Sequence, residues 1–201
     1  MKLYIIRHGE TTWNKQKRFQ GQKDIPLSEN GIALAQKVGQ AMRDIPLDYV
    51  ISSPLTRAIE TARLVVAGRN VPLTTDKRIQ ELCFGDWEGQ TADSPDTDLQ
   101  EYMKYFHSAP LKCIRPPHGE TFQDVCERTK SFLDELIHTP KYTDSNILIS
   151  THGAASRCLI HALDEESEDI WRGCIPPNCS VSIIEVNGGK ATLLEQDKLY
   201  A

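Results

Sequence analysis

The sequence predicts an α/β fold with a mainly parallel central sheet, and three observations support this. Apolar runs of strand length recur along the chain, at 3–6, 49–51, 147–149, 181–186 and, more weakly, 191–194. Segments with the apolar spacing of helices lie between them. Strands that alternate with helices are joined by right-handed crossovers, which place the strands in parallel and helices on both faces. We therefore predict a three-layer α/β/α sandwich.

Capping residues and periodicity locate two of the helices. Ser28 is a residue type favoured at helix N-caps, and an apolar residue follows at every fourth position. Thr121 and Asp124 have the spacing of a capping box ahead of a longer amphipathic pattern. The apolar positions are Leu34, Val38 and Met42 in the first helix, and Phe122, Val125, Thr129, Phe132, Leu133 and Leu136 in the second. Both patterns predict amphipathic helices packed on the sheet.

The segment 85–119 interrupts this alternation. It contains the acidic stretch "DSPDTDLQEY" and several prolines, at Pro95, Pro110, Pro116 and Pro117. We predict that residues 1–201 form a single domain, with 85–119 as an insertion that carries one short helix near 99–106 and acts as a lid. The alternative is an excursion of the chain without a functional role.

Composition and charge exclude several classes of function. The chain has 23 Lys and Arg against 28 Asp and Glu, a net charge of −5, and no dense basic stripe, so nucleic acid is not an expected partner. The apolar run before Arg7 is too short for a signal peptide, and no run of ~18 apolar residues could span a bilayer. We expect a cytoplasmic protein without a membrane partner. Its oligomeric state is left open, with a homodimer among the alternatives.

Three apolar strands are followed by residues suited to chemistry. "YIIRHG" ends in Arg7 and His8, "ILISTHG" ends in His152 and Gly153, and "YVISSPLTRA" leads into a helix with Arg57 in its first turn. The carboxyl ends of parallel strands meet at one edge of a sheet, where ligands bind in open α/β folds. We therefore expect these residues to converge on one site.

The residue types at this edge predict a phosphate site. Two guanidiniums, two imidazoles, Asn14 and helix N-termini supply the donors and positive charge that a phosphoryl group needs. Arginine can grip two phosphate oxygens at once because its donors form a planar fork. The glycine after each histidine, Gly9 and Gly153 in this chain, is expected to let the backbone approach the ligand closely.

The two histidines could serve a metal or a phosphoryl transfer. Guanidiniums beside them would repel a divalent cation, and the sequence has no H-x-x-x-H pair and no C-x-x-C pair among its six cysteines. We expect neither a metal nor a cofactor. With arginines disfavouring its protonation, His8 should be largely neutral near pH 7 and able to attack phosphorus, which predicts a phosphohistidine intermediate.

These motifs resemble those of the histidine phosphatase superfamily, also called the phosphoglycerate mutase-like family. "RHGETTWN" resembles its R-H-G-x-T-x-x-N signature, and "GQKDIPLSENG" resembles the continuation of that signature. Later blocks follow in the family's order, namely "SSPLTRAIETA", "RIQELCFGDWEG", "HGETFQDV" and "STHG". The likeness extends over nearly the whole chain.

The resemblance implies roles for individual residues. His8 would be the phosphorylated nucleophile, with Arg7, Arg57 and His152 binding the transferring phosphoryl group. Glu81 would be the general acid and base, and this assignment rests on the resemblance, with Glu88 as the next carboxylate. The rest of the substrate pocket would be formed by Asn14, Gln20, Gly21 and Gly153.

The family contains mutases and phosphatases, and the sequence favours the phosphatase branch. Mutases typically continue after the acidic residue with Arg-His-Tyr-Gly, whereas Glu81 is followed here by "LCFGDWEG". We expect hydrolysis of a small phosphate monoester, with a cofactor-dependent mutase and a catalytically silent phosphate-binding module as alternatives. If the lid closes over the leaving group, changes in its aromatic residues should alter KM among substrates. Those residues are Trp87, Tyr102, Tyr105 and Phe106.

Overall fold

A computed structural model describes residues 1–200 and shows a six-stranded sheet with the order β3-β2-β4-β1-β5-β6. The pairs β1–β4, β2–β4 and β2–β3 are parallel, while β5 is antiparallel to both β1 and β6. The strands are β1 (Lys2–Arg7), β2 (Tyr49–Ser52), β3 (Leu73–Thr75), β4 (Asn146–Thr151), β5 (Val181–Asn187) and β6 (Lys190–Lys198). The predicted strands are all present, and β3 is an addition that the sequence pattern did not indicate.

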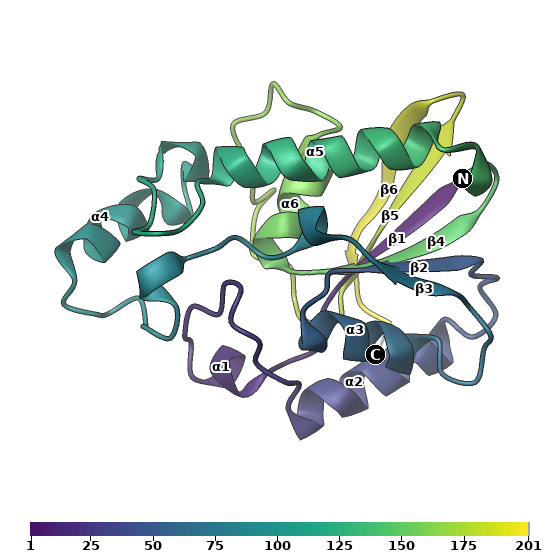
Figure 1. Ribbon diagram of the computed structural model, residues 1–201, viewed down its shortest axis with the longest axis horizontal. Coiled ribbons are helices and arrows are strands. Elements are labelled where there is room, and N and C mark those ends of the chain that lie inside the picture. The colour runs from purple at the N-terminus through teal and green to yellow at the C-terminus, as the bar shows by residue number, and fades with distance from the viewer. Residues whose placement is uncertain (201) are drawn as a thin grey trace.

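Helices cover both faces of the sheet, and the predicted three-layer α/β/α architecture is confirmed. Helices α2 (Glu29–Ala41) and α3 (Thr56–Val65) lie on one face, and α5 (Phe122–His138) and α6 (Gly153–His161) lie on the other (Figure 1). No helix within residues 1–200 combines the length and apolarity needed to cross a bilayer.

The core explains why the central strands read as continuous apolar runs. Along β1, Leu3 and Ile5 belong to the apolar cluster under α5 and α6, whereas Tyr4 and Ile6 belong to the cluster under α2 and α3. Successive side chains of a strand point to opposite faces, so a strand covered on both faces must be apolar at every position. The apolar run ends at Arg7, the last residue of β1.

The predicted caps are present at both helices that the sequence located. Ser28 Oγ accepts a hydrogen bond from the backbone N–H of Gly31 (3.1 Å). Thr121 Oγ1 accepts one from the N–H of Asp124 (3.2 Å), and the Asp124 carboxylate accepts one from the N–H of Thr121 (2.7 Å), which completes the capping box. Helix α2 therefore begins after Ser28 and α5 after Thr121.

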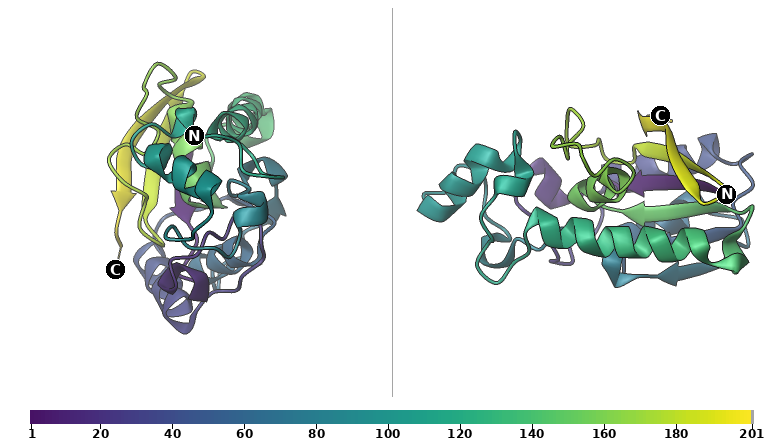
Figure 2. Two further views of the ribbon diagram at one scale, coloured as in Figure 1. Left: turned by 90° about the vertical axis from the view of Figure 1, so that its left-hand side faces the viewer. Right: turned by 90° about the horizontal axis from the view of Figure 1, so that it is seen from above.

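The segment 85–119 lies beyond the carboxyl edge of the sheet, away from the N-terminus of the chain (Figures 1 and 2). It contains α4 (Thr97–Phe106), at the position expected for its short helix, and two single-turn helices. Its side chains Trp87, Tyr102 and Phe106 belong to a buried cluster that also includes residues of α5 and α6. The aromatic members of this cluster are Phe84, Trp87, Tyr102, Phe106, Phe122 and Trp171.

Candidate active site

Strand register brings the predicted residues to one edge of the sheet. Arg7 pairs with Thr151 at the end of β1 and β4, and Ser52 pairs with Ser150 at the end of β2. All predicted site residues except His152 line one pocket of about 170 Å³ at this edge. His152 is fully buried behind it, with its ring centroid 5.2 Å from that of His8.

His8 is held with one ring nitrogen free. Its Nδ1 lies 2.7 Å from the carbonyl oxygen of Gly9. Because a carbonyl only accepts, Nδ1 carries the proton, and Nε2 keeps its lone pair and has no partner among residues 1–200. Burial lowers the pKa of His8 well below its ordinary value, and Arg57 and Arg7 lower it further. His8 is therefore neutral at pH 7, as a nucleophile requires.

Backbone carbonyls position both buried guanidiniums. Arg57 donates to the carbonyls of Lys23 and Gly21 (2.7 Å each), and Arg7 donates to that of Pro176. Burial lowers the pKa of Arg57 to about 10, so Arg57 remains charged at neutral pH, and burial also lowers the pKa of Arg7. The Nε atom of each arginine is buried without a partner among residues 1–200.

His152 adds a further unpaired group. Its Nε2 lies 2.7 Å from Ser53 Oγ, while its Nδ1 is buried and has no partner in the described part of the chain. Burial, followed by the charge of Arg57, lowers the pKa of His152 well below its ordinary value. A buried polar group without a partner costs about 1–3 kcal/mol. A bound anion would offset this cost at Arg7 and Arg57.

Glu81 reaches the same pocket from the loop after β3. Its carboxylate accepts hydrogen bonds from the N–H groups of Leu82 (3.0 Å), Gly153 (2.9 Å), Ala154 (3.1 Å) and Ala155 (3.2 Å). Three of these donors form the N-terminus of α6, where the helix dipole favours a negative charge. The carboxylate is thus fixed in the same pocket as Arg7, His8 and Arg57.

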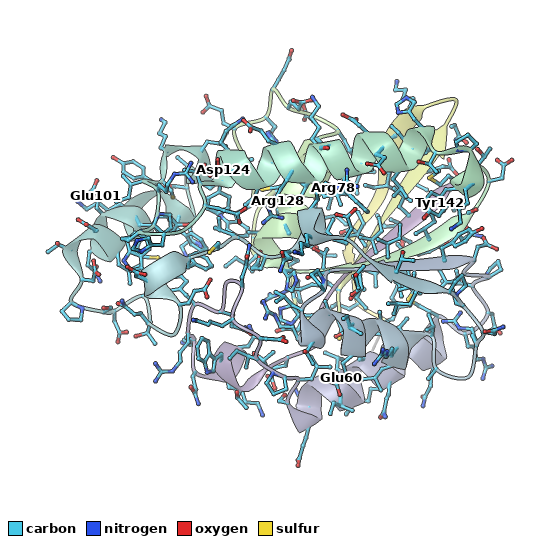
Figure 3. All side chains as sticks on the ribbon, in the orientation of Figure 1. Glu60, Arg78, Glu101, Asp124, Arg128 and Tyr142 are labelled. Atoms are coloured by element: carbon cyan, nitrogen blue, oxygen red, sulfur yellow. The ribbon has the colours of Figure 1, made fainter. Side chains whose placement is uncertain are left out.

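An ion pair holds the backbone of the loop that carries Glu81. Arg128 projects from α5 toward this loop (Figure 3) and donates to the carbonyls of Gln80 (2.8 Å) and Glu81 (3.0 Å). Its partner Glu120 pairs with it at 2.9 Å and accepts from the N–H of Cys83 (3.0 Å). Glu120 belongs to the "HGETFQDV" motif, so this motif positions Glu81.

The two glycines that follow the histidines have different roles. A Cβ on Gly153 would lie 3.5 Å from Glu81 Oε2 and 3.8 Å from Arg7 Nε, so this glycine keeps the pocket open. A Cβ on Gly9 would lie 2.7 Å from the carbonyl oxygen of Gly31 in α2. The expectation that Gly9 makes room for the ligand is wrong, because it makes room for a helix.

The remaining predicted residues lie on the loop after β1, which includes the short helix α1 (Thr12–Lys15). Asn14 Oδ1 accepts a hydrogen bond from the backbone N–H of Thr11 (3.0 Å), Gln20 Oε1 accepts one from the Thr11 hydroxyl (2.9 Å), and both residues line the pocket. Gly21 has a φ of +51°, and a Cβ there would collide with Glu88. Glu88 lies outside the pocket wall and accepts from the N–H of Gln22 (2.8 Å).

Apolar and basic residues complete the pocket, and most of them were not predicted from the sequence. Among the lid aromatics, Phe106 alone lines the pocket; Trp87 and Tyr102 are each 1% exposed in the aromatic cluster, and Tyr105 is exposed. Of these aromatic residues, we therefore expect only changes at Phe106 to alter KM among substrates. The wall also includes Lys17, Arg18, Phe19, Phe84, Trp171 and Ile175. These residues come from loops without a sequence pattern that marks them.

The fold and the geometry of this site agree with the comparison to known protein families. The chain belongs to the histidine phosphatase superfamily (branch 1), which it matches over residues 3–198. Members of this kind are phosphatases or mutase-like enzymes, and this chain is an enzyme of that group.

Individual relatives carry both kinds of name. A "Probable phosphoglycerate mutase GpmB" of Yersinia pestis is 32% identical over 185 residues, which cover 92% of this chain and 85% of that protein. The solved structure of YhfR from Bacillus stearothermophilus is 35% identical with a TM-score of 0.88, over 96% of this chain and 94% of that one. A putative alpha-ribazole-5'-P phosphatase from Escherichia coli is 28% identical with a TM-score of 0.86, over 98% and 96%.

Proposed function

We propose that this protein hydrolyses a small phosphate monoester through a phosphohistidine on His8. The observation that carries the proposal is the free Nε2 of a neutral, buried histidine beside two buried guanidiniums. The unpartnered Nε atoms of Arg7 and Arg57 supply the donors for a phosphoryl group at this position. The positive charge is thus provided by side chains, and the proposed reaction needs no metal ion.

The first step transfers the phosphoryl group to the enzyme. His8 Nε2 attacks phosphorus, a P–N bond forms, and the P–O bond to the leaving oxygen breaks. Arg7, Arg57 and His152 stabilise the equatorial oxygens of the transition state. Glu81 acts as the general acid in its protonated form: it gives its proton to the leaving alkoxide and becomes the carboxylate that the N–H groups at the start of α6 stabilise. In the second step Glu81 takes a proton from water, water attacks phosphorus, and the P–N bond breaks to release inorganic phosphate.

Two observations favour hydrolysis over phosphoryl return to substrate. The chain has "LCFGDWEG" after Glu81, and several solved structures that it resembles are described as phosphatases, among them a phosphoserine phosphatase from Entamoeba histolytica. The apolar part of the pocket wall, which includes Phe19, Phe84 and Phe106, suits the organic part of a monoester. The second candidate is a cofactor-dependent mutase, which the name of the Yersinia relative favours.

The test of the mechanism is trapping of the phosphoenzyme. Rapid acid quench with ³²P-labelled substrate should capture an acid-labile, base-stable phosphoenzyme in the wild type and none in His8→Ala. Hydrolysis of nitrophenyl phosphate should survive excess EDTA. Activity that EDTA removes and a divalent metal restores would contradict the mechanism.

A second measurement separates the two candidate functions. With 3-phosphoglycerate or another monoester, inorganic phosphate should appear faster than any isomer of the substrate. The same assay is repeated with added bisphosphoglycerate, the cofactor that a mutase would need. Isomerisation that outpaces phosphate release and depends on bisphosphoglycerate would assign the protein to the mutases.

A further inference from the structure

The loop between α6 and β5 contacts Arg7 and His8, two residues of the proposed phosphate site. We call residues 174–179 the strap. The strap carbonyl of Pro176 accepts from the Arg7 guanidinium, and Asn178 Nδ2 donates to the carbonyl of His8 (2.9 Å). The N–H of Cys179 donates to the carbonyl of Arg7 (3.0 Å). The strap therefore contacts both the side chain of Arg7 and the backbone of Arg7 and His8.

A buried arginine outside the pocket holds the other end of the strap. Arg157 lies on α6 with no exposed surface, and its Nε and one terminal nitrogen donate to the carbonyl of Cys174 (3.2 and 2.8 Å). The same terminal nitrogen donates to the Asp197 carboxylate at 2.5 Å. A buried guanidinium needs a charged partner, and Asp197 is the carboxylate that pairs with Arg157.

An irregularity in the edge strand brings Asp197 to Arg157. The pairing of β5 and β6 shifts register near Ile183, and Asp197 has a φ of +53°. Its N–H donates to the side-chain oxygen of Ser182 (3.1 Å). Such bulges redirect a side chain, and they are common beside functional sites. The carboxylate of an edge strand is thereby turned inward, while its neighbour Glu195 pairs with Lys198 on the surface.

Charge interactions also link Arg7, Arg157 and Asp197. Burial is the main cause that lowers the pKa of Arg7, and the nearby charge of Arg157 lowers it further. Asp197 acts in the opposite direction. The carboxylate therefore offsets the repulsion that a second buried guanidinium would exert on the arginine of the phosphate site.

We propose that Asp197 and Arg157 are positioning residues for phosphate binding, acting through the strap on Arg7 and His8. Asp197 pairs with Arg157, and Arg157 donates to the carbonyl of Cys174. Two residues further along the strap, the carbonyl of Pro176 accepts from Arg7. Asn178 is the second positioning contact, because it fixes the carbonyl next to the nucleophile. The inference rests on the proposed function, in which Arg7 binds the phosphoryl group.

The test compares Asp197→Ala with Glu195→Ala, which removes an exposed carboxylate from the same strand. Binding of inorganic phosphate is measured by titration calorimetry, alongside the midpoint of thermal unfolding. Loss of a charge-assisted hydrogen bond predicts that Asp197→Ala weakens phosphate binding about tenfold. Glu195→Ala should bind phosphate as the wild type does. Asp197→Asn keeps an acceptor oxygen and should recover part of the lost affinity.

A purely structural role predicts a different result. Asp197→Ala would then unfold at a lower temperature but bind phosphate within twofold of the wild type, and this would overturn the proposal. Phosphate binding needs no turnover, so this result is distinct from failure of the proposed function, which would appear as a wild-type protein that forms no phosphoenzyme.

Asn178 provides an independent test if Asp197→Ala does not fold. Asn178→Ala removes the donor to the His8 carbonyl but leaves the guanidiniums in place. We expect kcat for nitrophenyl phosphate to fall about tenfold while KM changes less than twofold. The nucleophile loses its alignment in this variant, whereas the groups that bind the phosphate are unchanged. An unchanged kcat in Asn178→Ala would also contradict the inference.

Discussion

The two sides of the pocket are built in different ways. The side that we propose binds phosphate, here called the phosphate side, has Arg7, His8 and Arg57 in the pocket wall and His152 behind them, and some of their buried nitrogens are unpaired within residues 1–200. Strand ends and backbone carbonyls hold these groups in place. The opposite wall, here called the lid side, is formed by Phe19, Phe84, Phe106 and Trp171 and is held by aromatic packing, as in the T-shaped contact of Phe106 and Trp171, with ring centroids 5.2 Å apart.

This difference separates two tasks. Directional hydrogen bonds to a rigid sheet edge keep donors within the narrow tolerances that a transition state requires. Apolar packing has no such directional demand, so the lid side can accept a different organic group when one side chain changes. We infer that the phosphate side sets the chemistry and that the lid side sets the substrate.

The largest expected effect is at Glu81, whose carboxylate lies in the same pocket as His8 and Arg57. An alkoxide leaving group needs a proton as its bond to phosphorus breaks, whereas nitrophenolate departs nearly unaided. Glu81→Gln should therefore slow phosphoryl transfer from an alkyl phosphate by ~10²–10⁴ and from nitrophenyl phosphate much less. Single-turnover rates with both substrates check this. Equal losses would remove Glu81 from the acid role.

A substitution on the phosphate side should not distinguish leaving groups. Arg57→Ala removes charge from the phosphoryl group itself, so we expect a loss of ~10²–10³ in kcat for alkyl and nitrophenyl phosphates alike. Arg63→Ala, near the other end of α3, is the control and should keep the wild-type rate. A loss confined to one substrate would show that the phosphate side also selects the leaving group.

Substitutions on the lid side should show the opposite pattern. Phe106→Leu removes an aromatic wall of the pocket, and we expect KM to change about tenfold for some monoesters and little for a small aryl phosphate. Trp87→Phe is the matched control, because Trp87 is buried outside the pocket. It should lower the free energy of unfolding by ~0.5–3 kcal/mol and leave relative KM values unchanged. Similar KM profiles for both variants would mean that the lid only supports the fold.

The smallest expected effect is a pH dependence of stability that comes from the phosphate side. The pKa values of His8 and His152 are lowered in the folded protein, whereas unfolded histidine titrates near its ordinary value of 6.5. Below about pH 6.5 the unfolded chain therefore binds more protons, and the free energy of unfolding falls by up to ~1.4 kcal/mol per pH unit per histidine. Urea unfolding in phosphate-free buffer at pH 7.5, 6.5 and 5.5 measures this fall. His152→Asn should reduce its slope; the same slope in both proteins would assign the effect to other groups.

Local pattern sufficed for the elements with strong periodicity. The central strands read as apolar runs because both faces are covered, and Ser28 and the capping box of Thr121 and Asp124 mark helix starts that depend only on nearby residues. The phosphate side was predictable for a related reason. Parallel strands end at one sheet edge, so Arg7, His8, Arg57 and His152 were bound to meet there.

Other features depend on contacts between distant segments, and the sequence alone could not reveal them. Strand β3 has only three residues, largely exposed, and exists because β2 pairs with it. Gly9 lies against Gly31, 22 positions away, and Arg157 pairs with Asp197, 40 positions away. The apolar wall of the pocket likewise joins distant segments, with Phe19, Phe84 and Trp171 among its residues. Local propensity carries no information about such pairings. They were decided by packing and by the need of buried polar groups for partners, which arise only when the chain is folded.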